Sequence, residues 1–274
     1  MSIMVVQLVP DGLLFGTDRN VTTSLRRGND VLASGQSEHP KVLKWPNHET
    51  VIGYVGRATV GDMQTDEWLY DFIGRNLLAD RGQPTHTDLQ QLAYELKNRL
   101  EFDLRRSGSV ADSAMILRLG GFVEDADQWK PEVWHVRNAQ AGTGYQNIAN
   151  EFDVFEAISS EFGGLTGDQI QAKVVEMARV WRPYWFHEGY DLETFNTLEQ
   201  VLRAGMKLLI ENSSHPLPDS LPYPDSLREW GKHLKMAILT YGSYFGAFYT
   251  PFQQFVGGGA DVVWAARPLT PPIP

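Results

Sequence analysis

The sequence predicts an α+β fold in which two antiparallel β-sheets pack together and helices cover both outer faces, a four-layer αββα sandwich. Segments with strand character occur in neighbouring groups and do not alternate one-for-one with helices, which disfavours a doubly wound parallel sheet. Most of the second half has helical periodicity. No linker divides the chain, so we expect a single domain over residues 1–274, with a helical and proline-rich expansion at about 166–225.

The expected elements of the first half follow from periodicity and turn residues. Residues 3–16 predict a hairpin that turns at Pro10-Asp11-Gly12. The polar stretch 19–40 predicts an exposed loop or an irregular hairpin. The remaining elements expected here are strands at 41–45 and 50–56, a helix from about 62 to 79, and a second helix opened by the capping box Thr87-x-x-Gln90.

The second half predicts a few strands and several long helices. The expected elements are a strand pair at 114–123 and 132–137 around a polar turn at 124–131, a further strand pair within 144–158, a helix opened by Thr166-x-x-Gln169, a helix at about 193–211, a proline-containing loop at 213–225, a long helix capped by Ser226-x-x-Glu229, and a buried type of strand at 260–266.

Composition and charge exclude several classes of function. Hydrophobic residues make up 42% of the chain and charged residues 21%, which is typical of a globular domain and not of a disordered chain. Cys is absent, so the chain has no disulfide, no thiolate nucleophile and no Cys-bound zinc. The net charge of −10 disfavours a nucleic-acid partner, since phosphate contacts need a clustered basic face. The densest basic cluster is only Leu25-Arg26-Arg27.

The N-terminal stretch predicts a cytoplasmic protein. It has no basic n-region, and Pro10 and Asp11 break its apolar run, so it differs from a secretory signal. No segment approaches the roughly 18 apolar residues of a membrane span. We expect no membrane partner.

Other chemical motifs are weak. His187-Glu188 lacks the second His of a zinc-protease motif because position 191 is Asp, so we expect a surface His and no metal site. No G-x-S-x-G string marks an α/β-hydrolase nucleophile. The aromatic cluster at 181–186 predicts core or helix–helix packing, or a subunit interface if it is exposed. No motif calls for a cofactor.

The element order, together with several local strings, resembles the proteasome β-subunit family of N-terminal-nucleophile hydrolases, and within it the simpler bacterial protease that works with a heat-shock ATPase. The interval from Ser2 to Asp18 is sixteen residues, equal to the family's interval from nucleophile to buried Asp. The other matching strings are Asp11-Gly12-Leu13-Leu14-Phe15-Gly16-Thr17-Asp18, Lys41-Val42-Leu43-Lys44-Trp45, Val51 to Ala58, Gly61-Asp62 at the expected first helix, Leu119 to Val136, Ala157-Ile158-Ser159-Ser160 and Val256 to Val263.

This resemblance implies catalysis by an N-terminal hydroxyl. A Ser hydroxyl needs a neighbouring base to attack an amide. An α-amine with a pKa of about 7.7–8.0 supplies that base on the same residue. The implied roles are Ser2, exposed by removal of Met1, as nucleophile and base; Lys41 as activator; and Asp18 as the residue that orients Lys41. The implied oxyanion donor is the backbone N–H of Gly56, and Ser160 matches a site Ser.

Each of these residues also has a simpler interpretation. Ser commonly follows an initiator Met, Asp18 could cap a turn with Thr17, and Ser160 could be an ordinary strand-end Ser. Lys44 competes with Lys41, and because they are three residues apart they face opposite sides of a regular strand. Only one of them can be the site Lys.

The resemblance therefore predicts a peptidase that acts on peptides or proteins in a homo-oligomeric, ring-like assembly. Two alternatives remain open: a catalytically silent proteasome-fold subunit with an assembly or binding role, and a hydrolase of small amides. The sequence does not identify an ATPase partner.

Overall fold

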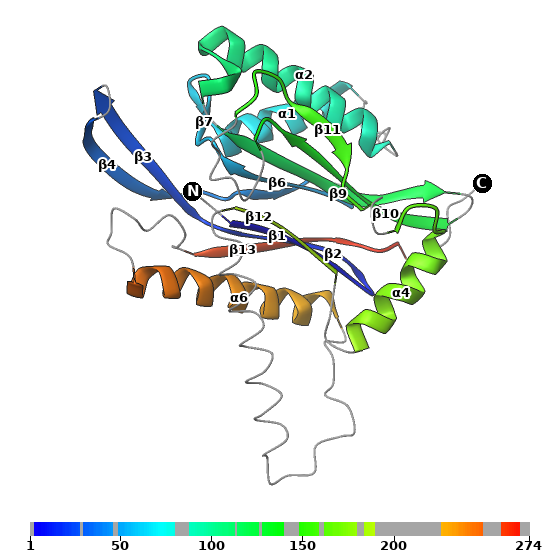
Figure 1. The fold of residues 1–274 in the computed structure, drawn as a ribbon. Coiled ribbons are helices and arrows are strands. Elements are labelled where there is room, and N and C mark those ends of the chain that lie inside the picture. The colour runs from blue at the N-terminus through cyan, green and yellow to red at the C-terminus, as the bar shows by residue number, and fades with distance from the viewer. Residues whose placement is uncertain are drawn as a thin grey trace.

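The computed structural model describes residues 3–27, 30–45, 49–79, 88–112, 114–125, 128–139, 148–158, 162–179, 184–189, 226–248 and 259–268 of the 274-residue chain. These residues form a mixed structure of antiparallel sheets and helices, which confirms the α+β class (Figure 1). None of the described helices is long and apolar enough to cross a membrane.

The first sheet has four antiparallel strands in the order β12-β1-β2-β13. Their bounds are β1 Ile3–Val9, β2 Gly12–Asp18, β12 Tyr184–Gly189 and β13 Ala260–Ala266. Alternate residues of β1 are buried on opposite faces of this sheet: Ile3 and Val5 pack toward α6, and Val6 and Leu8 pack toward the second sheet. Burial on both faces explains why this strand reads as an almost continuous apolar run.

The second sheet has five antiparallel strands in the order β11-β10-β9-β6-β5. Their bounds are β5 Val42–Lys44, β6 Thr50–Gly56, β9 Met115–Asp125, β10 Gln128–Arg137 and β11 Asp153–Glu156. Phe15 and Leu13 of the first sheet share a buried cluster with Val51 and Val133 of the second, so the two sheets face each other across an apolar layer.

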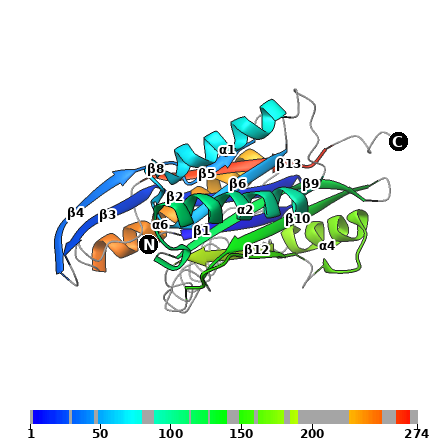
Figure 2. The same ribbon diagram turned by 90° about the horizontal axis from the view of Figure 1, so that it is seen from above.

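Helices lie on the outer faces of both sheets (Figures 1 and 2). The helix α1, Thr65–Ala79, and the helix α2, Leu89–Ser107, share a large apolar cluster with the second sheet. The long helix α6, Leu227–Phe248, covers the first sheet through Trp230, Leu234 and Ile238. The helix α4, Gly167–Arg179, packs on β1 and β10, one strand from each sheet.

The shorter elements are hairpins and one turn of 3₁₀ helix. The hairpin strands are β3 Asn20–Arg27 with β4 Asp30–Glu38, and β7 Thr59–Val60 with β8 Met63–Gln64; the 3₁₀ turn η1 is Val110–Asp112. The expected hairpin at 3–16 is confirmed as β1 and β2. The stretch 19–40 is the irregular hairpin, with a register shift between Leu25 and Arg26.

Several predicted boundaries need correction. Helix α1 begins at Thr65 and not at 62, because Gly61 (φ 61°) and Asp62 form the turn between β7 and β8. Asp88, whose side chain accepts from the Gln91 N–H at 3.0 Å, caps α2 in place of Thr87. The polar turn at 124–131 is shorter than expected, since both strands extend into it. The caps Thr166 and Ser226 are confirmed by their hydrogen bonds to Gln169 and Glu229.

The largest error concerns the second half. Residues Tyr184–Gly189, which include His187 and Glu188, form the strand β12 on β1, although they lie between segments that read as helices. Strand β13 is only partly buried, with Trp264 36% exposed. Within 144–158, β11 is the one strand among the described residues. The predicted helix at 193–211, the loop at 213–225 and residues 181–183 of the aromatic cluster lie outside the described residues.

Candidate functional site

A buried ion pair joins two of the residues that the sequence singled out. Lys41 Nζ lies 3.2 Å from Asp18 Oδ2. The Lys41 ammonium also donates to the backbone carbonyl of Asn20. The two side chains are 2% and 1% exposed. A pair so completely removed from water is held together by its geometry and by its additional hydrogen bonds.

The second oxygen of Asp18 is bound to the start of the chain's first strand. Asp18 Oδ1 accepts a hydrogen bond from the backbone N–H of Ile3 at 2.9 Å. This contact follows from the antiparallel register of β1 and β2, in which Met4 pairs with Thr17. In the sequence, Ile3 directly follows Ser2. The carboxylate therefore connects Lys41 with the residue next to the candidate nucleophile.

The hairpin β3–β4 brings Lys41 to Asp18 across 23 residues of sequence. Its strands begin pairing at Asn20 and Glu38, and the His39 N–H donates to the Arg19 carbonyl at 3.0 Å. After the hairpin the chain therefore lies beside Arg19 again, directly before β5 begins. The Lys41 carbonyl then accepts from the Tyr54 N–H at 2.9 Å, which fixes this backbone against β6.

Burial controls the protonation of the pair. Burial raises the pKa of Asp18, while the neighbouring Lys41 and the Ile3 N–H oppose that rise. Burial lowers the pKa of Lys41, and Asp18 opposes that change. Removal from water disfavours the charged form of each group, so Lys41 releases a proton more readily than a solvated Lys.

Gly56 ends β6 in a conformation that suits glycine. Its φ is 107°, and a Cβ at this position would overlap the backbone carbonyl oxygen of Ala114. That same carbonyl accepts from the Arg57 N–H at 3.0 Å, so it cannot easily move away. Gly56 is two residues beyond Tyr54, the residue that binds the Lys41 carbonyl. The turn at Gly56 therefore belongs to the same strand that supports the ion pair.

The structure distinguishes between the two candidate lysines. Lys44 is 40% exposed and pairs with Glu49 at 3.0 Å, whereas Lys41 is buried against Asp18. Asp18 and Lys41 are in contact, as the resemblance requires, and Gly56 lies on the neighbouring strand. Ser2 and Ser160 are outside the described residues.

Three neighbours of the pair were not found from sequence. One is the Asn20 carbonyl, which no sequence pattern reveals. Another is Tyr54, whose pKa is raised by burial and, secondarily, by the nearby carboxylates of Asp66 and Asp18. The third is a contact between His39 Nδ1 and Asp66 Oδ2 at 3.3 Å. His39 precedes Lys41 by two residues, and in an extended chain residues at this spacing lie on the same side. That spacing is a sequence signal that could have identified His39.

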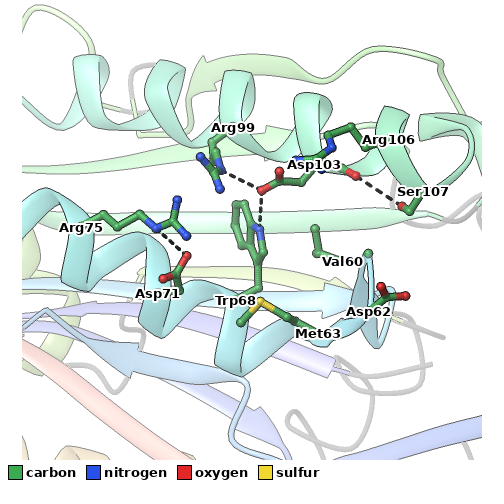
Figure 3. Close-up of a pocket in the computed structure, with 11 residues that line it drawn as sticks. Val60, Asp62, Met63, Trp68, Asp71, Arg75, Arg99, Asp103, Arg106 and Ser107 are labelled. Atoms are coloured by element: carbon green, nitrogen blue, oxygen red, sulfur yellow. Dashed lines mark hydrogen bonds and ion pairs between the residues drawn. The ribbon is translucent and has the colours of Figure 1, made fainter.

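A separate groove lies between α1, α2 and the β7–β8 turn (Figure 3). It has a volume of about 530 Å³. Trp68 forms part of its lining and donates to Asp103 at 2.9 Å, and Arg99 binds the same carboxylate oxygen at 2.7 Å. None of the sequence-predicted site residues lines this groove, so it is distinct from the Asp18–Lys41 pair.

The described residues contain no cluster of three or more His, Asp or Glu side chains that could hold a metal ion. The side-chain and backbone groups around Asp18 and Lys41 can transfer protons, stabilise charge and donate hydrogen bonds. These groups can assist a nucleophile, and the candidate nucleophile Ser2 lies outside the described residues.

No known protein family matches the sequence, and no curated protein does. Solved structures that are similar to this chain include two of Anbu. A Gly-1 mutant of Anbu from Hyphomicrobium sp. strain MC1 is 13% identical, covers 97% of this chain and 83% of its own, and has a TM-score of 0.46. Anbu from Yersinia bercovieri, named as an ancestral beta-subunit, is 14% identical, covers 96% and 80%, and has a TM-score of 0.44.

Proposed function

We propose that this protein is a proteasome-like N-terminal-nucleophile hydrolase that cleaves peptide bonds with Ser2 after removal of Met1. Its layers would then form the αββα sandwich of those enzymes. The observation that carries the proposal is the position of the buried Asp18–Lys41 pair. One Asp18 oxygen binds the backbone N–H that directly follows Ser2, and the other lies against Lys41.

The proposed reaction needs no group beyond the chain and water. The Ser2 hydroxyl gives its proton to its own α-amine while Oγ attacks the carbonyl carbon of the scissile amide. The amine then protonates the leaving nitrogen as the C–N bond breaks, which leaves an ester on Ser2. Water, deprotonated by the same amine, hydrolyses that ester and restores the hydroxyl.

Lys41 and Asp18 would assist each of these steps electrostatically. A cationic Lys41 lowers the pKa of the Ser2 hydroxyl and favours the neutral amine, which is the form that accepts a proton. Asp18 holds the ammonium in place through the 3.2 Å contact. The backbone N–H of Gly56 would donate to the oxyanion, and such contacts are often the largest contribution to catalysis. Ser160 is proposed as a further site residue, and the family resemblance is the support for it.

We propose that the active form is a homo-oligomer, ring-like in shape, that acts on peptide or protein substrates in the cytoplasm. The two other functions differ from this in testable ways. A silent subunit would keep a blocked or unreactive Ser2. A small-amide hydrolase would have a reactive Ser2 but would leave polypeptides intact.

The test is the intact mass of the purified protein before and after incubation with a peptide epoxyketone, which reacts with both the hydroxyl and the free amine of an N-terminal nucleophile. We expect loss of Met1 and a single adduct. Ser2→Ala should give no adduct, and Lys41→Ala should slow adduct formation strongly. Retention of Met1 without an adduct would reject the hydrolase and favour the silent subunit.

Lys44→Ala is the matched control for the lysine. Lys44 is an exposed Lys three residues away that pairs with Glu49, so its loss removes the same charge without touching Asp18. The adduct should form in Lys44→Ala at the rate of the unmodified protein. Equal slowing in both lysine variants would show that net charge, and not the buried pair, controls the reaction.

A further inference from the structure

The contact between His39 and Asp66 has no part in the reaction proposed above. His39 Nδ1 lies 3.3 Å from Asp66 Oδ2, and because a carboxylate only accepts, the imidazole Nδ1–H is the donor. The Asp66 side chain is 9% exposed and the His39 side chain 29%. The other oxygen, Asp66 Oδ1, is buried and accepts no hydrogen bond among the described residues. A buried carboxylate with so few partners depends strongly on the one side chain that binds it.

Asp66 is fixed to the turn that carries the proposed oxyanion donor. It lies in the first turn of α1, directly after Thr65. The Thr65 hydroxyl donates to the Arg57 carbonyl at 2.8 Å, and the Thr65 N–H donates to the Ala58 carbonyl at 2.9 Å. Arg57 directly follows Gly56. The start of α1 and the Gly56 turn are therefore held together.

His39 is fixed to the segment that carries Lys41. The His39 N–H donates to the Arg19 carbonyl at 3.0 Å, and two residues later the Lys41 carbonyl accepts from the Tyr54 N–H at 2.9 Å. The Tyr54 side chain has a hydrogen bond with the backbone of Asp66. These contacts form a closed ring through the Lys41 segment, β6 and the start of α1. The side chains of His39 and Asp66 join the first and last of these parts directly.

We infer that His39 and Asp66 are positioning residues whose contact sets the place of Lys41 relative to the Gly56 turn. The inference rests on the hydrolysis proposed above, in which Lys41 activates Ser2 and the Gly56 N–H donates to the oxyanion. His39 acts through Asp66 and does not touch the substrate. Because a misplacement of about 1 Å can reduce the rate of an enzyme about a hundredfold, loss of the contact should slow the reaction strongly.

Two substitutions of His39 separate this role from a direct one. Asn carries its amide nitrogen near the position of Nδ1 and can donate to Asp66, whereas Gln carries its amide nearer to Nε2 and leaves that contact unmade. His39→Asn should form the epoxyketone adduct at close to the rate of the unmodified protein. His39→Gln should be about 10–100-fold slower, with a lower kcat and little change in KM for a fluorogenic peptide. The reverse order, or equal rates in the two variants, would overturn the inference.

Asp66→Ala tests the other side of the contact. It should be slowed as much as His39→Gln, and the double variant should be no slower than either single variant, because both remove the same contact. Asp71→Ala is the matched control on the same helix, since Asp71 pairs with the exposed Arg75 at 2.8 Å and should leave the rate unchanged. Independent, multiplying effects of His39→Gln and Asp66→Ala would contradict a shared role.

Hydrogen exchange tests the positioning without any need for hydrolysis. The Arg57 N–H donates to the Ala114 carbonyl at 3.0 Å, so it reports on the Gly56 turn. Its exchange should be faster in His39→Gln and Asp66→Ala than in His39→Asn, Asp71→Ala and the unmodified protein. Unchanged exchange in all variants would overturn the inference. Faster exchange in a protein that forms no adduct even when unmodified would reject only the proposed catalysis.

Discussion

Lys41 lies 3.2 Å from Asp18, and both side chains are almost completely removed from solvent. The two residues are 23 positions apart in the sequence, and the β3–β4 hairpin lies between them. Their contact therefore depends on the pairing of β3 with β4 and not on local sequence. The pair connects β2 to Lys41, the residue that directly precedes strand β5 of the facing sheet. The pair therefore adds charged groups to a largely apolar layer between the two sheets.

Replacing Lys41 with Met should destabilise the protein by about 3–5 kcal/mol, because it leaves the Asp18 carboxylate buried without its counter-ion. The midpoint of urea-induced unfolding, followed by tryptophan fluorescence, measures this change. The protein should still fold at low denaturant, since the apolar layers on both sides of the pair remain.

The double variant Asp18→Asn with Lys41→Met is the control for that result. It removes both charges, keeps side chains of similar volume, and leaves the Asn oxygen able to accept from the Ile3 N–H. We expect it to recover most of the lost stability, because replacing a buried ion pair by neutral groups is often close to neutral. A double variant less stable than Lys41→Met would show that the charges are not the source of the effect.

Gly56→Ala should be far more damaging than Gly61→Ala. Both glycines have positive φ, but a Cβ at Gly56 would overlap the Ala114 carbonyl, while a Cβ at Gly61 has no atom within 4 Å. Gly61→Ala should cost about 1 kcal/mol, the usual cost of a left-handed non-glycine residue. Gly56, with φ 107°, lies outside that left-handed region, so Gly56→Ala carries at least this backbone cost and must also displace the strand end. Thermal unfolding of the two variants measures the difference. Equal losses of stability in Gly56→Ala and Gly61→Ala would contradict this prediction.

The sequence predicted best those features that depend on residue type and short-range spacing. The interval from Ser2 to Asp18 led to a residue that does bind the start of β1. The odd spacing of Lys41 and Lys44 predicted that the two lysines face opposite sides of a strand, and in the structure Lys41 is buried while Lys44 is exposed. Alternation and turn residues similarly placed the β1–β2 hairpin, since its turn is encoded by Pro10, Asp11 and Gly12.

Features that depend on distant partners could not be predicted in this way. Strand β12 is recognisable only by its pairing with β1, nearly 180 residues earlier in the chain. Helix α1 starts later than its apolar periodicity suggested because residues 59–64 form a small hairpin first. The Asn20 carbonyl accepts a hydrogen bond from Lys41 because of the backbone path at the start of β3. Every residue has a backbone carbonyl, so the sequence cannot indicate which one accepts this bond.

The chemistry proposed for Ser2 predicts a difference between two substitutions. Ser2→Thr keeps a hydroxyl on an N-terminal residue small enough for Met1 removal, so peptide hydrolysis and the epoxyketone adduct should persist. Ser2→Ala should reduce both to background, because it deletes the only proposed nucleophile. Hydrolysis of a fluorogenic peptide together with intact mass provides the measurement. Hydrolysis that survives in Ser2→Ala would place the nucleophile elsewhere.

His135 should make the protein sensitive to acid. It is 5% exposed on β10, directly opposite Arg118 and close to Arg137. Burial, and then the charges of Arg118 and Arg137, lower its pKa to about 2. An unfolded His takes up a proton below a pH of about 6.5. Between those two values the unfolded state binds the extra proton, so His135 lowers the stability of the fold as the pH falls.

This contribution amounts to about 1.4 kcal/mol for each pH unit below about 6.5. His135→Phe removes the titrating group but keeps a ring that can pack on Phe155, which lies 4.8 Å from the imidazole centroid. Urea unfolding at pH 7.5, 6.0 and 5.0 should show a shallower loss of stability in His135→Phe than in the unmodified protein. Other titrating groups contribute equally to both proteins, so the difference between the two slopes isolates His135. Parallel slopes would mean that His135 becomes protonated in the folded state.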